Sequence, residues 1–238
     1  MQYYLTDKEL DRMKSGLKTA MAIPLIDDIE DYILEAIWEY AKDIDGIDPF
    51  YNTRSKKLYD VVDTKTKIGW SVKSIQWAFY DGCQFELVIQ RADVFKKAES
   101  LGFPPLDKNS DPDIIGAALL KHWEQKVVED AVEQGVTSKR IMVLLKSEDK
   151  KRFAVLEEDI KQYSADEIKW QWTNAQKNGL QGIRKSDNFC VYRWYPSQKQ
   201  FFERFVLSNT SQKININPVR LTKGQVVDLL LPFLEEQK

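Results

Sequence analysis

The clearest alternation of apolar and polar positions runs from Leu58 to Trp77. Residues 58–63 are rich in Val and Tyr, residues 64–67 are polar, and Ile, Val and Trp recur over residues 68–77. Alternating apolar runs on either side of a short polar segment are typical of a β-hairpin. The pattern therefore predicts two antiparallel strands joined by a four-residue turn.

The rest of the chain alternates between helical and strand patterns. Capping residues and apolar stripes at a spacing of three and four predict helices, and period-two or continuous apolar runs predict strands. The helices fall at about 6–18, 27–41, 94–100, 111–134 and 224–234, and the strands at 84–92, 140–146 and 153–157. We expect an α/β fold in which the hairpin, the 84–92 strand and the two later strands form one mixed sheet of about five strands, flanked by helices.

The last third of the chain has a different character. Tryptophan, tyrosine and phenylalanine are interleaved with Lys, Arg, Asn and Gln over about residues 161–217, which predicts a β-rich region. Trp170 and Trp172 are two residues apart, so on a strand they share a face, and we expect them to pack inward. Stacking on nucleic-acid bases is the alternative for these aromatic side chains.

Composition places broad limits on the class of protein. The chain has 238 residues, of which 43% are hydrophobic and 30% charged, as in globular proteins. Its net charge of −2 neither requires nor excludes a nucleic-acid partner. We expect a cytoplasmic protein without a membrane partner, because the chain has no run of membrane-spanning length and no signal-peptide pattern, and its two cysteines suggest neither a disulfide framework nor a zinc site.

The hairpin gathers reactive side chains. With a four-residue turn, Asp63 pairs with Ile68, and Asp60 falls opposite Ser71 on the same face of the ladder. Lys73 is two residues beyond Ser71 and shares that face. A slip of one residue would exchange the roles of Asp60 and Asp63, and the pattern alone leaves both registers open.

A carboxylate beside a lysine is suited to phosphodiester chemistry. A carboxylate binds Mg²⁺, which prefers hard oxygen ligands and retains several waters. The lysine can orient a water molecule or neutralise charge on a phosphate. The single histidine, His122, lies in the long helix and is a poor candidate for a catalytic base, and it argues against a histidine-rich metal site.

Asp60, followed after a short turn by Ser71-Val72-Lys73, resembles the PD-(D/E)xK nuclease superfamily and, within it, the type II restriction endonucleases. Asp60 matches the motif's Asp, Val72 its apolar middle residue and Lys73 its Lys. Two positions depart from the pattern, since Tyr59 replaces the Pro and Ser71 replaces the second acidic residue. The acidic-x-Lys triplet alone is weak, because it recurs elsewhere in so charged a chain, and a solvated edge hairpin is the alternative reading.

The resemblance implies a restriction-endonuclease-like fold and a Mg²⁺-dependent active site. Asp60 and the Val72 carbonyl would hold the metal, Lys73 would act on the attacking water or the phosphate, and Ser71 would act through water. The missing carboxylate would come from Glu86, if its strand neighbours the hairpin. The other candidates are Asp63, next after Glu86, and two glutamates of the 27–41 helix, Glu30 and Glu35.

The implied substrate is double-stranded DNA, cut at specific sites by a homodimer. Its contacts would come from the β-rich region, where the candidates are Lys177, Gln181, Arg184, Lys185 and Arg193. We expect one nuclease domain with a catalytic core at about 20–160, a recognition region at 161–217 and a terminal helix at 223–236. The alternatives are a repair or mobile-element nuclease of the same fold, and a non-catalytic DNA- or protein-binding module with a decayed site.

Overall fold

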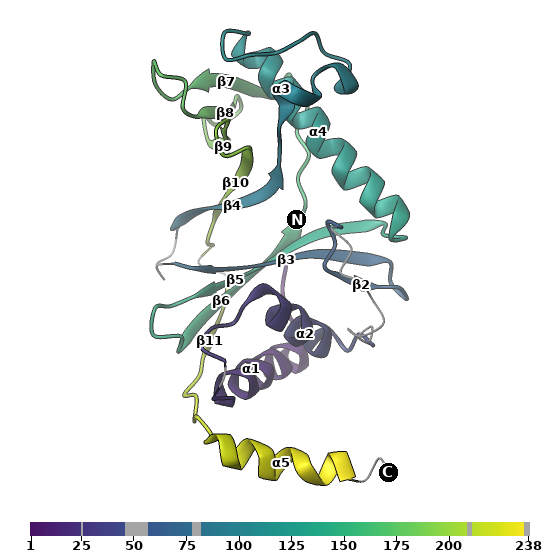
Figure 1. Ribbon diagram of the computed structural model, residues 1–238, viewed down its shortest axis with the longest axis vertical. Coiled ribbons are helices and arrows are strands. Elements are labelled where there is room, and N and C mark those ends of the chain that lie inside the picture. Colours follow the sequence, from purple (N-terminus) through teal and green to yellow (C-terminus); the bar gives the residue numbers. More distant parts are fainter. Residues whose placement is uncertain (25, 46–56, 78–81, 209–210, 236–238) are drawn as a thin grey trace. The chain divides into compact units, whose positions relative to one another are not determined.

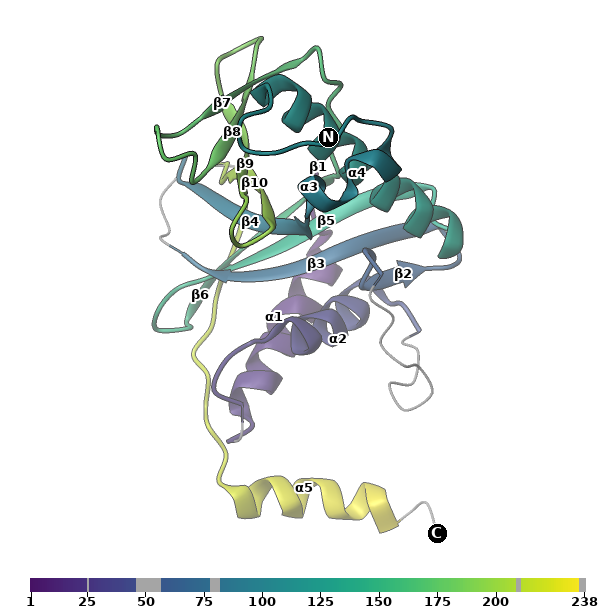
Figure 2. The ribbon, with the colours of Figure 1, turned by 45° about the horizontal axis from the view of Figure 1, so that its top comes forward.

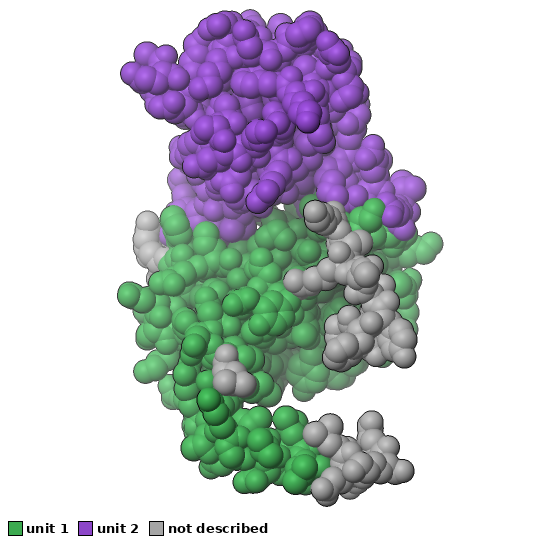
Figure 3. Space-filling model, viewed as in Figure 1, with its two compact units in different colours: residues 1–79, 134–159, 210–238 green, residues 80–133, 160–209 purple. Residues whose placement is uncertain are grey.

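The computed structural model describes residues 1–24, 26–45, 57–77, 82–208 and 211–235 (Figure 1). The chain forms two compact units (Figure 3). Unit 1 comprises residues 1–79, 134–159 and 210–238, and unit 2 comprises residues 80–133 and 160–209. The chain therefore passes from one unit to the other four times, and the division does not follow the contiguous core and recognition segments expected from the sequence.

Unit 1 is built on a mixed sheet. Its path runs β1-β6-β5-β3-β2, and β11 also pairs with β6. The β3 and β5 strands are parallel, while the other pairs are antiparallel. The strands are β1 (Gln2–Tyr3), β2 (Val61–Asp63), β3 (Ile68–Gln76), β5 (Ser138–Lys146), β6 (Arg152–Asp159) and β11 (Gln212–Asn215). The mixed α/β sheet that the pattern predicts is confirmed, and the apolar run at 140–146 is its buried central strand.

The hairpin of β2 and β3 has the expected register. Asp63 pairs with Ile68, and Val61 pairs with Trp70. The Asp63 carboxylate accepts hydrogen bonds from the Lys65 amide at 2.9 Å and from Thr66 Oγ1 at 2.5 Å. A four-residue turn closed by its own aspartate leaves one way of pairing the strands, so the register depends on local chemistry.

Two helices pack together on one face of this sheet (Figure 2). They are α1 (Asp7–Ala22), which begins with a capping box between Thr6 and Glu9, and α2 (Asp31–Lys42). Their apolar stripes meet the alternate residues of β3, β5 and β6, and Trp38 of α2 lies edge-on to Trp70 of β3 with ring centroids 6.1 Å apart. The remaining helix of unit 1 is α5 (Lys223–Glu235).

A buried ionic network lies beneath these helices. Glu157 on β6 is 1% exposed, and its carboxylate contacts Lys42 Nζ at 3.1 Å, Arg140 Nη1 at 2.8 Å and Trp70 Nε1 at 2.7 Å. A buried charge is tolerated when its partners satisfy it in this way. The network therefore joins α2 to three strands of the sheet.

Unit 2 contains a second sheet, antiparallel throughout, with the order β4-β10-β9-β8-β7. Its strands are β4 (Gln84–Arg91), β7 (Ile168–Trp172), β8 (Leu180–Arg184), β9 (Cys190–Tyr195) and β10 (Gln200–Val206). The expectation that the 84–92 strand belongs to the mixed sheet is wrong, because β4 pairs with β10. Its alternation correctly indicates a half-buried strand but carries no information about which sheet it joins.

One face of this second sheet, here called the inner face, packs on helices. These are α4 (Pro112–Glu133), which contacts β7, and α3 (Val94–Lys97), whose Phe95 ring lies edge-on to Trp194 of β9. The 3-10 turn η1 (Glu99–Leu101) contacts α3 and α4. Trp170 lies against Gly116 of α4 and, as expected, is buried, at 3% exposure, while Trp172 is half-buried. Asp113 of α4 accepts a 2.7 Å hydrogen bond from the Trp170 amide, which fixes β7 to the helix. Among the described helices, none is long and apolar enough to cross a membrane.

Candidate active site at the end of the hairpin

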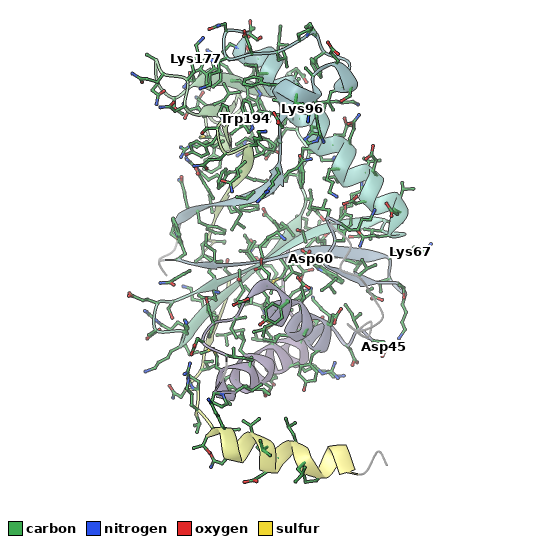
Figure 4. The ribbon with its side chains drawn as sticks, in the orientation of Figure 1. Asp45, Asp60, Lys67, Lys96, Lys177 and Trp194 are labelled. Carbon is green, nitrogen blue, oxygen red and sulfur yellow. The ribbon has the colours of Figure 1, made fainter. Side chains whose placement is uncertain are left out.

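Asp60, labelled in Figure 4, lies just before β2 begins, and its carboxylate forms an ion pair with Lys73. The Asp60 amide donates to the Trp70 carbonyl at 2.9 Å, although Trp70 is already the ladder partner of Val61, so the regular pairing ends at Val61 and Asp60 lies beside that last pair. Lys73 Nζ lies 3.0 Å from Asp60 Oδ2. The structure therefore brings together the carboxylate and the ammonium that the hairpin was expected to gather, although Asp60 lies just outside the regular register.

The Asp60 side chain replaces backbone pairing at the next position of the ladder. Its Oδ2 atom accepts a 2.8 Å hydrogen bond from the Val72 amide, which in a regular antiparallel ladder would bind a carbonyl of the neighbouring strand. The carboxylate thus covers the edge of β3 where its partner strand ends. Because the Val72 amide is bound by a side chain and not by a continuous ladder, the Asp60 carboxylate can leave it and bind another group more easily than a backbone carbonyl could.

Lys73 occupies a position between two hard oxygen atoms. Its Nζ atom is 3.0 Å from Asp60 Oδ2 and 2.9 Å from the Val72 carbonyl oxygen. The side chains of Asp60 and Lys73 are 23% and 28% exposed, so solvent reaches both. Carboxylate and carbonyl oxygens are also the kind of hard donor that Mg²⁺ prefers.

A second carboxylate lies at the same strand edge. Asp31, the first residue of α2, accepts hydrogen bonds from the Ser74 amide at 3.1 Å and Ser74 Oγ at 3.0 Å. Amides two residues apart on a strand point to the same edge, so Val72 and Ser74 present their N–H groups about 7 Å apart on that edge. The Val72 carbonyl lies between these amides, and Asp60 and Asp31 therefore flank it.

Asp31 was not among the acidic residues proposed from the sequence. Glu30 is the exposed residue before α2, and Glu35 is a half-buried residue of that helix. An aspartate at a helix start is ordinarily explained by the helix dipole, so sequence gives no sign of a further role. Only the packing of α2 on β3 reveals the contact with Ser74.

Ser71, at the motif's usual acidic position, is buried. It is 3% exposed and pairs with Ile141 of the parallel neighbour β5.

Asp63 forms hydrogen bonds within the turn and does not belong to this site. Burial opposes ionisation of Asp63, but hydrogen bonds from Thr66 and Lys65 outweigh it and lower the pKa of the carboxyl below its ordinary value.

Glu86 is not placed as the sequence suggested. It lies on β4 in unit 2, and β3 pairs instead with β2 and β5 in unit 1. Its carboxylate accepts a 3.0 Å hydrogen bond from Arg204 Nε and lies 3.3 Å from Arg193 Nη1. The condition for its role as a metal ligand is therefore not met, and we remove it from the site.

The metal-binding capacity of the site is limited. Within the described parts of the chain, no three His, Cys, Asp or Glu side chains gather into a group that could hold a metal ion. A Mg²⁺ ion needs only one or two carboxylates, because waters and substrate phosphates complete its shell. Asp60 and the Val72 carbonyl, with Asp31 nearby, fit that minimal set.

The five predicted DNA-contacting residues all lie in unit 2 but do not share one surface. Gln181 and Arg193 pair across β8 and β9 on the outer face, which is the face away from α4. Arg184 is three residues from Gln181 and so has the opposite orientation, with its guanidinium on the Asp187 carboxylate at 2.6 and 2.9 Å. Lys177 and Lys185 lie in the turns at opposite ends of β8, and Lys177 is labelled in Figure 4.

His122 is buried on α4, with 7% exposure. Burial, together with the positive charges of Lys97 and Lys126, lowers the pKa of His122 to about 4. Its Nε2 atom lies 2.7 Å from Lys97 Nζ. The imidazole is therefore neutral at physiological pH, and its Nε2 atom accepts a hydrogen bond from the Lys97 ammonium.

Comparisons with known proteins give no relative. No family model, no curated protein and no solved structure matches the chain. The fold and the hairpin geometry define a mixed α/β protein with a second antiparallel sheet, and its function has to be argued from the site.

Proposed function

We propose that the protein is a Mg²⁺-dependent, site-specific endonuclease that hydrolyses phosphodiester bonds of double-stranded DNA, similar to a type II restriction enzyme. The observation that carries the proposal is the position of Lys73 Nζ between Asp60 Oδ2 and the Val72 carbonyl. On an ordinary edge hairpin, an exposed lysine ion pair of this kind would add little to the stability of the fold. Asp60 and the Val72 carbonyl would provide a cation site directly beside the Lys73 ammonium.

Each residue has a defined role in the proposal. Asp60 and the Val72 carbonyl would hold Mg²⁺, which supplies positive charge for the phosphate and acidifies a bound water. Lys73 donates hydrogen bonds to the attacking water or to the phosphate oxygens. Because its ammonium now contacts both metal-binding oxygens, Lys73 and a divalent cation compete for them.

Asp31 supplies the acidic group that position 71 lacks. Its carboxylate is bound to the amide two residues beyond the Asp60 contact, on the same strand edge. In that place it adds negative potential beside the Val72 carbonyl and so strengthens cation binding. Ser71, buried beneath the edge, contributes packing and a hydroxyl.

A homodimer accounts for site-specific cutting of both strands. Two-fold symmetry matches a palindromic site, as in other dimeric DNA-binding proteins. The α5 helix exposes Val227, Leu229, Leu230 and Leu231, each between 47% and 58%. An exposed apolar helix of this kind favours association with a second copy.

The test of this function is cleavage of plasmid and phage DNA by the purified protein, with Mg²⁺ and with EDTA. We expect discrete fragments in Mg²⁺ and intact DNA in EDTA. A smear of Mg²⁺-dependent products would instead indicate a repair or mobile-element nuclease.

A non-catalytic binding module is the second candidate. The buried serine at position 71 favours it, since the usual second carboxylate of the motif is missing there. Intact DNA under all conditions, together with a mobility shift in a gel, would support this candidate over the nuclease.

A further inference from the structure

The hairpin formed by β7 and β8 is unusually basic. Residues 168–184 contain Lys169, Lys177 and Arg184 but no Asp or Glu, so the segment carries a charge of +3 in a chain whose net charge is −2. The same segment holds five amide side chains, namely Gln171, Asn174, Gln176, Asn178 and Gln181. Arg184 is bound to Asp187, just beyond this segment. The two lysines and the amides that remain are suited to a polyanion with hydrogen-bonding edges.

Strand alternation sorts these side chains onto two faces. Trp170, Leu180 and Gly182 belong to the buried inner face, which packs toward α4. Lys169, Gln171 and Gln181 therefore point to the outer face, where Lys169 and Gln171 are exposed and Gln181 is half-buried. The hairpin thus presents a polar, positively charged outer surface over an apolar base.

Gln171 and Gln181 form a direct cross-strand pair. Their Cβ atoms are therefore about 5 Å apart. At that separation the two amide groups can contact neighbouring base pairs, which are stacked about 3.4 Å apart. The row continues to Arg193 on β9, which pairs with Gln181. Three side chains that commonly bind base edges thus lie in line across three strands.

The cations on the neighbouring strands are held in place. Arg193 and Arg204 both contact Glu86, the one acidic residue that alternation puts on the outer face of this fully described sheet. One carboxylate shared by two guanidinium groups leaves net positive charge and restricts both side chains. Little further side-chain entropy is lost when such groups bind a ligand.

The hairpin also has a suitable place in the sheet. The β7 strand is an edge strand, and the turn that follows it is exposed at four of the five positions from Thr173 to Lys177. The B-DNA major groove, about 12 Å wide, accommodates a two-stranded β-ribbon. The major groove of A-form RNA is too narrow for one, so the shape favours DNA.

We propose that the outer face of the β7–β8 hairpin enters the major groove of double-stranded DNA, with Gln171 and Gln181 on base edges and Lys169 and Lys177 at the phosphates. The inference rests on the proposed function and deepens it by locating sequence recognition. It replaces the five-residue set expected from sequence, because Arg184 is bound to Asp187 on the opposite face.

Binding experiments in a Lys73→Ala background with Mg²⁺ test the inference while the DNA remains intact. The probe is a pool of duplexes with a randomised centre, from which preferred sequences are selected. We expect Gln171→Ala with Gln181→Ala to weaken binding of the selected duplex at least about tenfold, and binding of unselected duplex less than about twofold. Lys169→Ala should weaken both and lower the salt dependence by about one counterion.

Lys121→Ala and Gln125→Ala on α4 are the matched controls, and we expect both to bind as the background protein does. Variants of the hairpin that bind like these controls would overturn the inference. If wild-type protein still cuts DNA in that case, the proposed function stands and only the recognition surface is wrong. Failure of the background protein to bind any duplex, with no cutting by wild type, would overturn both.

Discussion

Asp60 and Asp31 bind alternate amides of one strand edge. For Asp31, a substitution can remove the negative charge while keeping the hydrogen bond to the strand. An asparagine at position 31 keeps an oxygen that accepts from Ser74 and loses only the charge. We therefore expect Asp31→Asn to fold normally, to cut DNA about tenfold to a hundredfold more slowly, and to need more Mg²⁺ for half-maximal rate. Calorimetric titration with Mg²⁺ measures the affinity without relying on cleavage.

Asp27→Asn is the control for this prediction, because Asp27 is an exposed aspartate nearby that pairs with Arg220. Unchanged Mg²⁺ affinity in Asp31→Asn would show that Asp31 only positions Ser74.

His122 gives a pH prediction, and as the single histidine its ring signal can be followed by NMR. Its folded-state pKa is about 4, against an ordinary value of 6.5, so the unfolded chain binds more protons between these values. The free energy of unfolding therefore rises with pH across that window and falls by about 2–3 kcal/mol on acidification through it. A ring titration midpoint near 6.5 would contradict this account.

At the scale of elements, the contact between α4 and β7 depends on one glycine. A Cβ atom built on Gly116 would lie 2.2 Å from Trp170 ring atoms, although alanine is normally the better helix former. We expect Gly116→Ala to lower the free energy of unfolding by about 1–3 kcal/mol, measured by urea denaturation. Gly224→Ala in α5, which meets no atom closer than 4.0 Å, should be neutral or slightly stabilising.

The elements that could be predicted from sequence are those determined by residues close to one another along the chain. The two strands and the four-residue turn of the hairpin followed from the pattern, whereas the choice between its two registers became clear only from the hydrogen bonds by which Asp63 closes the turn. The α4 helix followed from Asp111 and Pro112 at its start and from Gly135, which has a φ of 68°, just after its end. Such signals lie within a few residues of the feature they determine.

The errors came from partners distant in sequence. The β4 strand pairs with β10, more than a hundred residues away, and Glu86 meets Arg204 through that pairing. Likewise, the contact of Asp31 with Ser74 depends on how α2 packs on the sheet. Alternation reports that a residue is half-buried, but not which element covers it.

At the scale of the whole molecule, the exposed apolar side chains of α5, namely Val227, Leu229, Leu230 and Leu231, need an explanation. If two copies associate through this helix, a charge at its centre should separate them. We expect Leu230→Glu to shift the protein from dimer to monomer in sedimentation velocity at micromolar concentration. Val132→Glu on α4, which is also an exposed apolar position at 78%, should leave the dimer intact.

A wild-type protein that sediments as a monomer at all concentrations would contradict the dimer. The proposed active site would be unaffected by that result, because all of its residues belong to one chain.

The most direct test of the central claim compares two lysines of the same hairpin. Lys73 lies between Asp60 and the Val72 carbonyl, whereas Lys65, in the turn, forms an exposed ion pair with Asp45. We predict that Lys73→Ala lowers the rate of Mg²⁺-dependent DNA cleavage by about a hundredfold or more, and that Lys65→Ala cuts at the wild-type rate. Equal cleavage by Lys73→Ala and wild type would show that the active site is not on this hairpin.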